Sequence, residues 1–144
     1  MKELFVKAKH CLGCKSCEIA CAVAHSNSKN LAAALKENPL SITRVKVKSS
    51  QTTRFDLRRC RHCKKPLCVA ACGNGAISKT GNKTIIDDEK CLGCFKCVSN
   101  CPFGALNIQK DRRIVLVCDH CEELGEPACV KACPTGVFTN ERLS

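Results

Sequence analysis

The sequence predicts an α+β fold of short helices and small β-hairpins, built from a duplicated unit. Cysteines recur four residues apart at several points, and one helical turn between two such residues places both side chains on one face. Short segments rich in β-branched residues lie between these turns and are interrupted by glycine, as in hairpins. The chain has 144 residues, which is enough for one domain or two very small ones.

All sixteen cysteines fall into four groups of four with similar internal spacing. Group one is Cys11, Cys14, Cys17 and Cys21; group two is Cys60, Cys63, Cys68 and Cys72; group three is Cys91, Cys94, Cys97 and Cys101; group four is Cys118, Cys121, Cys129 and Cys133. Groups one and three have the spacing C-x2-C-x2-C-x3-C, which bacterial [4Fe–4S] proteins use. The pattern predicts four [4Fe–4S] clusters and a role in carrying electrons.

The groups repeat in pairs along the chain. The sequence CLGC at 11–14 recurs at 91–94, and C-x-H-C at 60–63 recurs at 118–121. Groups two and four then run through a proline into C-V-x-A-C. Each half of the chain therefore carries one shorter and one longer group, which indicates an internal duplication.

The helices are expected at the cysteines and in one insert. The third and fourth cysteines of each group lie at i and i+4, which predicts four short helices. Between groups one and two, the alanine-rich segment 30–36 predicts a further helix. The segment 42–48 follows it and alternates apolar and basic residues, which predicts a half-exposed strand.

Two hairpins are expected in the second half of the chain. The segments 76–78 and 84–87 flank a glycine turn at Gly81, and the pair forms the first hairpin. The segments 105–109 and 113–117 are joined by three polar residues and form the second.

The composition predicts a thin hydrophobic core. The chain has five phenylalanines and neither tryptophan nor tyrosine. Small cores of this kind need covalent or metal staples. We therefore expect folding and cluster assembly to be coupled.

The net charge of +11 would ordinarily favour nucleic-acid or anionic-membrane binding. That charge counts every cysteine as neutral, whereas a [4Fe–4S] core with its four thiolates contributes roughly −2. Four clusters therefore bring the oxidised protein to about +3. Aromatic residues make up only 3% of the chain and do not interleave with the basic residues, which argues against nucleic acid as a partner.

Zinc and disulfides are the other chemistries that cysteines support. Zinc ribbons use two C-x2-C pairs across a longer gap, unlike these groups. No stretch approaches the ~18 apolar residues of a membrane span, and the residues before Cys11 leave no room for a secretion signal. We expect a cytoplasmic protein without direct membrane insertion, and the reducing cytoplasm favours metal ligands over disulfides.

Two histidines occupy matching positions in the repeat. His62 and His120 each stand directly before a cysteine. Hydrogen bonding or proton exchange at a cluster fits these positions, and so does the capping of a loop. His10 and His25 are expected in solvent or in packing.

The motifs resemble those of the four-cluster ferredoxin-like electron-transfer subunits, the family of the dimethyl sulfoxide reductase iron–sulfur subunit. Within that family, the opening at 11–26 and the absence of a membrane anchor are most similar to the ferredoxins associated with CO dehydrogenase. The resemblance implies two bacterial-ferredoxin-like 2[4Fe–4S] domains, duplicated and interleaved. Residues 1–54 plus 111–144 would form the first, and residues 55–110 the second.

The same resemblance implies that distant groups exchange their fourth cysteine. Cluster 1 would take Cys11, Cys14, Cys17 and Cys133; cluster 2 would take Cys118, Cys121, Cys129 and Cys21; cluster 3 would take Cys60, Cys63, Cys68 and Cys101; cluster 4 would take Cys91, Cys94, Cys97 and Cys72. The chain departs from the family where proline follows the fourth cysteine: Pro102 and Pro134 are present, but groups one and two have Ala22 and Gly73.

The resemblance also implies redox protein partners. A CO dehydrogenase would be the electron donor, and a hydrogenase or another reductase the acceptor. The alternative is a permanent electron-transfer subunit of a formate dehydrogenase or hydrogenase complex. The sequence contains no catalytic constellation and no dinucleotide-binding glycine motif, so we expect an electron carrier rather than an enzyme.

Overall fold

The structure is a computed structural model that describes residues 5–51 and 55–139. The chain divides into two compact units. Unit 1 combines both chain ends, Met1–Arg58 and His120–Ser144, and unit 2 is the middle, Arg59–Asp119. The boundaries of these units differ from those expected for the two ferredoxin-like domains. The expected domain boundaries stay a proposal. Residues 1–4, 52–54 and 140–144, which the first expected domain includes, lie outside the described residues.

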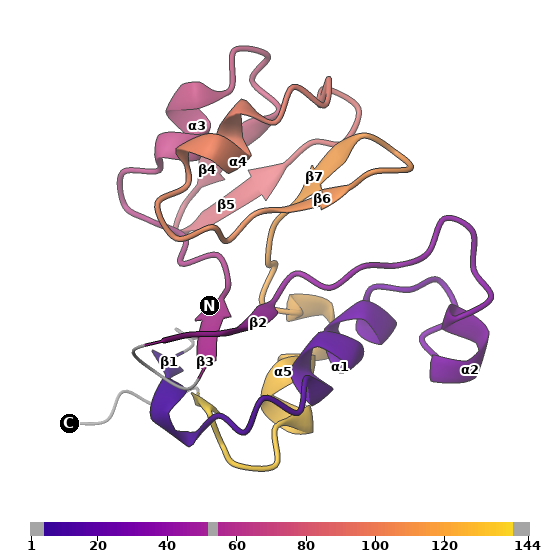
Figure 1. Ribbon diagram of the computed structural model, residues 1–144. Coiled ribbons are helices and arrows are strands. Elements are labelled where there is room, and N and C mark those ends of the chain that lie inside the picture. Colours follow the sequence, from indigo (N-terminus) through magenta and orange to yellow (C-terminus); the bar gives the residue numbers. More distant parts are fainter. Residues whose placement is uncertain (1–4, 52–54, 140–144) are drawn as a thin grey trace. The chain divides into compact units, whose positions relative to one another are not determined.

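Unit 1 is built from short elements of both chain ends (Figure 1). In chain order they are β1 (Phe5–Val6), η1 (Ala8–His10), α1 (Ser16–Ala24), α2 (Leu31–Ala34), β2 (Lys46–Ser49), β3 (Phe55–Arg58), η2 (Glu122–Leu124), α5 (Ala128–Ala132) and β8 (Phe138–Thr139). The N-terminal β1 pairs antiparallel with the C-terminal β8, and α1 packs against α5. The two ends of the chain are therefore joined both by a sheet and by a helix pair.

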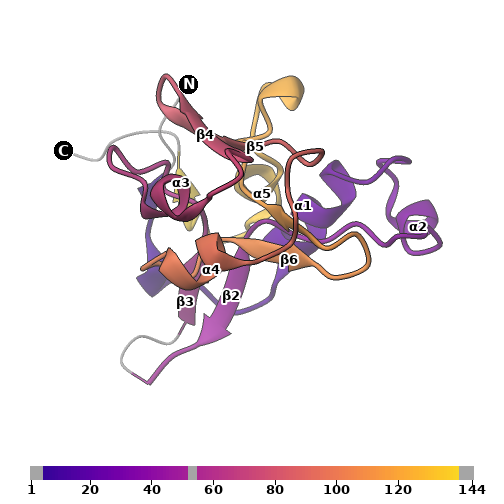
Figure 2. The ribbon, with the colours of Figure 1, turned by 90° about the horizontal axis from the view of Figure 1, so that it is seen from above.

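The expected strand at 42–48 is shorter and lies later than predicted. β2 covers Lys46–Ser49 and pairs antiparallel with β3, with Val47 opposite Leu57 (Figure 2). Val45 and Val47 are buried in the core of unit 1, while Lys46 and Lys48 are exposed, so the expected alternation is present. The pairing with β3 had no counterpart among the expected elements.

Unit 2 contains both expected hairpins. β4 (Ile77–Thr80) pairs with β5 (Lys83–Ile86), and β6 (Asn107–Gln109) pairs with β7 (Ile114–Leu116). Gly81 has a φ of 59° in the first turn, a conformation that glycine adopts without strain. The helices α3 (Leu67–Ala71) and α4 (Lys96–Asn100) pack against each other (Figure 1).

The helices confirm the prediction from the cysteine spacing. α1, α3, α4 and α5 each begin near the third cysteine of a group, and the fourth cysteine lies at or directly after the helical turn. The insert helix α2 covers Leu31–Ala34, within the expected 30–36, and begins where the Asn30 side chain accepts the Ala33 N–H. The observed architecture is a small α+β ferredoxin-like fold of short helices and hairpins.

Cysteine thiols form much of the core of each unit. The core of unit 1 packs valines and Phe138 around buried cysteines of groups one and four: Cys11, Cys17, Cys21 and Cys129. The core of unit 2 has Ile77, Leu106 and Val115 around Cys97. A core in which ligand thiols replace aliphatic side chains is what the thin hydrophobic composition predicts.

Candidate iron–sulfur centres

One pocket in unit 1 is lined by four cysteines from two distant groups. These are Cys11, Cys14 and Cys17 of group one together with Cys133 of group four. The remaining lining is largely apolar and includes Val47, from β2, and Leu12. The pocket therefore gathers the thiols that the resemblance assigned to cluster 1.

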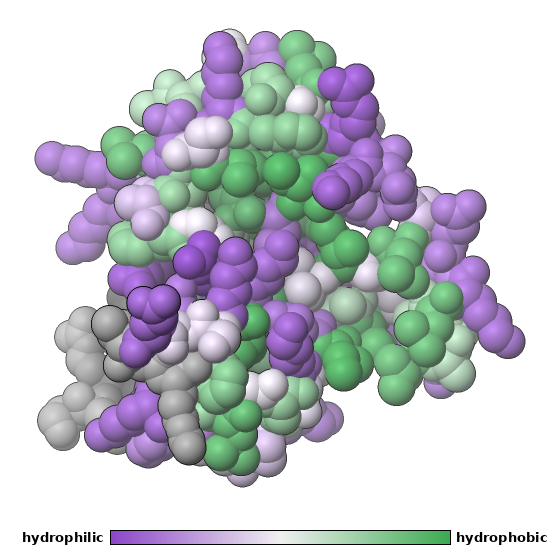
Figure 3. Space-filling view, viewed as in Figure 1, coloured by the Kyte–Doolittle hydropathy of each residue, from purple (hydrophilic) through white to green (hydrophobic). Residues whose placement is uncertain are grey.

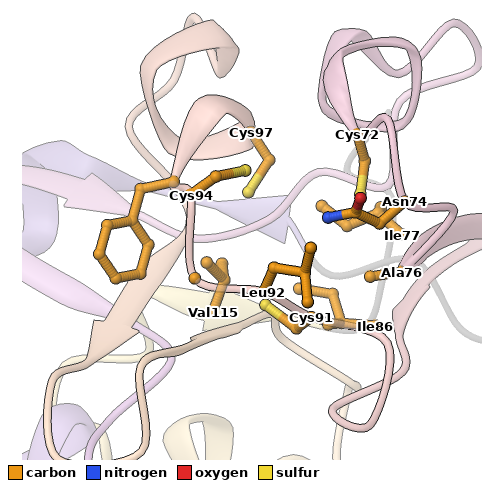
Figure 4. A pocket seen from close by; sticks show the side chains of 12 residues that line it. Cys72, Asn74, Ala76, Ile77, Ile86, Cys91, Leu92, Cys94, Cys97 and Val115 are labelled. Carbon is orange, nitrogen blue, oxygen red and sulfur yellow. The ribbon is translucent and has the colours of Figure 1, made fainter.

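A second pocket, in unit 2, is likewise lined by three cysteines of one group and one cysteine of another (Figure 4). Cys91, Cys94 and Cys97 of group three line it together with Cys72 of group two, which lies at the end of α3. Asn74 and an apolar surface that includes Val115 complete the lining. Three thiols from one loop and one from a distant helix end thus share a pocket for a second time.

The other two sets are only partly brought together. Cys68 and Cys101 pack against the same hydrophobic cluster of unit 2, which brings the fourth cysteine of group three to group two. Cys21 and Cys129 belong to the same buried cluster of unit 1. Cys118 falls in unit 2 and the other three cysteines assigned to cluster 2 fall in unit 1.

In groups one and two, the loop at the start of the group turns a backbone N–H toward a thiol. Gly13 donates its N–H to Cys11 Sγ at 3.4 Å, and His62 donates its N–H to Cys60 Sγ at 3.4 Å. Both residues occupy the position before the second cysteine of their group, and both have positive φ, 71° and 48°. Gly93 and His120 repeat this conformation in groups three and four. The left-handed residue is therefore what lets the N–H face the sulfur.

A second N–H follows the fourth cysteine. Ala105 donates to Cys101 Sγ at 3.5 Å and Val137 donates to Cys133 Sγ at 3.4 Å, four residues along the chain in each case. A glycine with positive φ, Gly104 or Gly136, precedes each donor. The positive φ of the glycine turns the backbone so that the next N–H faces the sulfur.

Group one departs from this pattern at Cys21. The helix α1 continues through Ala24, and no left-handed glycine follows. The N–H of Arg44, from the insert, donates to Cys21 Sγ at 3.2 Å instead. His25 Nδ1 lies 2.7 Å from the Cys21 carbonyl oxygen and 3.7 Å from Cys21 Sγ. Sequence reasoning missed both contacts, because Arg44 lies 23 residues away and His25 carries no motif.

The electrostatics of the thiols separate two classes. Burial raises the pKa of Cys17 to about 12, and raises that of Cys60 and of Cys97 to about 11. Hydrogen bonds from the backbone beyond it, Ile77 first, lower the pKa of Cys72. Iron binds the thiolate, so the buried thiols must give up a proton that they hold tightly.

Burial and hydrogen bonding oppose each other at two fourth cysteines. Burial acts to raise the pKa of Cys21, but hydrogen bonds from His25 and Arg44 outweigh it and the pKa is lowered. At Cys133 burial is likewise outweighed, here by the Val137 N–H and the Thr135 hydroxyl. Hydrogen bonds that favour a thiolate also favour a negatively charged cluster, so Cys21 and Cys133 both lie in surroundings suited to a charged cluster.

His62 has a structural contact that favours the loop-capping interpretation. Its ring Nδ1 accepts the Thr84 N–H from β5 at 2.9 Å, and its carbonyl oxygen accepts Lys79 Nζ at 3.0 Å. An Nδ1 that accepts is unprotonated, so the ring is neutral with its proton on Nε2. The imidazole thus fastens the group-two loop to the β4–β5 hairpin.

The donor set fits [4Fe–4S] clusters. Each of the two pockets offers four thiols with largely apolar walls, and backbone N–H groups point at the sulfurs.

Within the residues that the structure describes, no helix has the length and apolar character needed to cross a membrane.

Comparison with known protein families gives the same chemistry. Residues 51–142 match a family described as the 4Fe-4S dicluster domain, and residues 8–24 match a 4Fe-4S binding domain. The chain belongs to the 4Fe-4S dicluster domain family. It is an iron–sulfur electron-transport protein.

Curated relatives extend over nearly the whole chain. An iron–sulfur protein of Rhodospirillum rubrum is 36% identical over 148 residues, which cover 92% of this chain and 77% of that protein. The electron transport protein HydN of Escherichia coli is 32% identical, with 92% of this chain and 83% of that protein covered. The NADH-dependent phenylglyoxylate dehydrogenase subunit beta of Aromatoleum evansii is 34% identical over 89% of this chain, which corresponds to 27% of that subunit.

Proposed function

We propose that the chain holds four [4Fe–4S] clusters in two interleaved ferredoxin-like domains and passes electrons between two redox enzymes. The observation that carries this proposal is the pair of pockets, each lined by three cysteines of one group and one cysteine of another. The exchange of fourth cysteines is the arrangement that two-cluster ferredoxins use. The ligand sets proposed for clusters 1 to 4 are those implied by the resemblance.

When bound, each cluster accepts and releases one electron, and the residues of the chain set how readily this happens. The cysteine thiolates fix the position of each cluster. Backbone N–H groups of Gly13, Ala105 and Val137 stabilise negative charge on the sulfurs. Apolar residues line both pockets, with Val115 in the pocket of Figure 4 and Val47 in the pocket of unit 1. They keep water away from the thiols, and a hydrogen bond to sulfur is stronger in such surroundings.

We propose a CO dehydrogenase as the electron donor and a hydrogenase or another reductase as the acceptor. The opening at 11–26 supports this assignment through its similarity to CO dehydrogenase-associated ferredoxins. A permanent place within a larger oxidoreductase is the second candidate. It is supported by the Aromatoleum evansii dehydrogenase subunit, in which a sequence like this one makes up about a quarter of the length.

The test is anaerobic reduction of the brown holoprotein by catalytic amounts of enzyme. CO with CO dehydrogenase is compared with H2 and hydrogenase, and with formate and formate dehydrogenase, while bleaching of the cluster absorbance is followed. Fast bleaching with CO alone supports the proposed donor. Bleaching only with another donor overturns the CO assignment and keeps electron transfer, whereas co-purification with a larger enzyme at high salt supports the permanent subunit.

A further inference from the structure

The insert between α1 and β2 exposes a cluster of leucines. Leu31, Leu35 and Leu40 are 52%, 70% and 47% exposed, and Ala32 and Ala33 between them are exposed as well. Figure 3 shows the apolar surface gathered over α2. We call Leu31, Leu35 and Leu40 the leucine patch. Contiguous apolar surface of a few hundred Å² is about the size of the largest patch on a typical monomer, and such patches are often functional.

Polar contacts hold this insert in its shape. The Glu37 carboxylate accepts the N–H of Asn27 at 3.2 Å and the N–H of Ser28 at 2.8 Å, and the hydrogen bonds from Ser28 hold the pKa of Glu37 below its usual value. The buried Ser26 hydroxyl donates to the Val23 carbonyl at 2.6 Å and accepts the Lys29 N–H at 3.0 Å. These hydrogen bonds therefore stabilise the loop in the conformation that leaves the leucine patch exposed.

The insert is also tied to a candidate cluster ligand. The Ser41 hydroxyl donates to the Ala22 carbonyl at 2.7 Å, and the Arg44 N–H donates to Cys21 Sγ at 3.2 Å. The segment that carries the patch thus follows Cys21 in the chain, and the residues after the patch contact Cys21 and Ala22 again. A protein bound at the patch would lie on the part of the chain that supports this thiol.

We propose that the leucine patch is the docking surface for an oxidoreductase partner that exchanges electrons through the cluster held by Cys21. This inference rests on the proposed function. The partner would present an apolar centre with an acidic rim, because the exposed Lys36 directly follows Leu35 in the chain. The other nearby charges are engaged within the insert: backbone N–H groups donate to the Glu37 carboxylate, and Lys29 Nζ donates to the Ala24 carbonyl at 2.9 Å. A small apolar centre suits the brief encounters of redox proteins, whose interfaces are at the lower end of the size range.

A second copy of the chain fits this surface less well than such a partner. Symmetric pairing through the patch would bring Lys36 of one copy near Lys36 of the other, and like charges in an interface are unfavourable. The patch is also smaller than the ~800 Å² that each partner contributes to a stable interface. Self-association of the holoprotein at micromolar concentration through the patch would overturn the assignment to an oxidoreductase.

The test is equilibrium binding of holoprotein to immobilised CO dehydrogenase, hydrogenase and formate dehydrogenase. The variant Leu31→Ser/Leu35→Ser should bind its enzyme at least about tenfold more weakly than wild type. The Lys36→Glu variant should also bind more weakly than wild type. Added salt should reduce the difference in affinity between this variant and wild type, because it screens the charges. The matched control is Ile85→Ser, whose side chain is 45% exposed on β5 in the other unit. Iron content and the dithionite-reduced spectrum establish that all variants are loaded.

The outcomes separate this inference from the proposed function. Weaker binding by the leucine variant with unchanged binding by Ile85→Ser supports the docking surface, even where no enzyme bleaches the clusters and the proposed donor is wrong. Equal binding by the leucine variant and wild type overturns the docking surface, even where CO reduces both. Binding to none of the three enzymes overturns it as well.

Discussion

Single residues in a left-handed conformation shape the thiol loops. Gly13, His62, Gly93 and His120 stand at one repeated position, before the second cysteine of each group, and all have positive φ. Histidine is among the residues that tolerate this region better than most, so groups two and four keep the turn without glycine. The four groups therefore share a backbone conformation at this position, while the surroundings decide which residue provides it: a Cβ at Gly13 would collide with the Phe55 ring, whereas the His62 ring accepts the Thr84 N–H.

Gly93 must be glycine for a second reason, in addition to its positive φ. A Cβ there would collide with the carbonyl oxygen of Arg113, whereas a Cβ at Gly75 would meet nothing within 4 Å, although both residues have φ near +69° and +68°. Gly75→Ala should therefore cost about 1–2 kcal/mol from backbone strain alone. Gly93→Ala should cost about 1–3 kcal/mol more from the collision. The temperature at which the cluster absorbance bleaches measures the difference, and equal temperatures would contradict it.

The ligand exchange can be tested by iron content in double variants. Cys72→Ala with Cys91→Ala removes two ligands of one proposed cluster, so about 12 irons should remain per chain. Cys72→Ala with Cys60→Ala removes ligands of two clusters, so about 8 should remain. If each group instead held its own cluster, Cys72 would pair with Cys60, and the two iron contents would be reversed.

At the scale of elements, side chains fasten the cysteine loops to the hairpins and strands. The Glu18 carboxylate, on α1, accepts the Val47 N–H of β2 at 2.6 Å. In unit 2, the ring of His62 accepts the Thr84 N–H of β5. A hairpin of four-residue strands is marginal by itself, so these links, together with apolar packing, hold it in place.

The contact of His62 predicts a structural role without proton exchange. His62→Ala leaves the N–H of buried Thr84 without its acceptor, which should cost about 1–3 kcal/mol of stability. Because His62 Nδ1 accepts the Thr84 N–H, His62 should add nothing to the pH dependence of the reduction potentials, which should change with pH alike in wild type and His62→Ala. Potentiometric titration at several pH values checks this. A potential that falls steadily with pH in wild type, and no longer does so in His62→Ala, would show proton exchange instead.

At the scale of the whole molecule, charge and core both depend on the thiols. The formal charge of +11 compensates thiolates and clusters, and the buried cores contain cysteines where other small proteins have aliphatic residues. Without iron, the thiols lose the metal bonds that would join distant segments of each unit. We therefore expect loss of the clusters to unfold the chain, visible as loss of the helical signal in far-ultraviolet circular dichroism.

Acid should speed this loss. Burial raises the pKa of Cys17 to about 12 and of Cys60 and Cys97 to about 11, so protons compete with iron for these thiols at neutral pH. The competition weakens as pH rises toward these values, by at most about tenfold per pH unit for each proton. Bleaching in a neutral iron chelator such as bipyridine should therefore be slower at pH 8 than at pH 6. Equal rates at both pH values would contradict the proton linkage.

Cysteine spacing in the sequence determined the chemistry of this protein and most of its local structure. The i, i+4 cysteines predicted four helices, and the glycine-interrupted segments predicted two hairpins, because both patterns are set by residues a few positions apart. Spacing alone leaves open which distant cysteine completes each set. The gathering of Cys133 with group one, and of Cys72 with group three, is a property of the folded units.

Only the tertiary structure decided the contacts between residues far apart in the chain. The pairing of β2 with β3, the hydrogen bond from Arg44 to Cys21, and the link between His62 and Thr84 each join residues without a shared motif. The exposure of Leu35 is likewise invisible in a sequence that otherwise reads as an alanine-rich helix. Such contacts depend on which surfaces pack together in the folded chain. Patterns of residues close together in the sequence do not determine that packing.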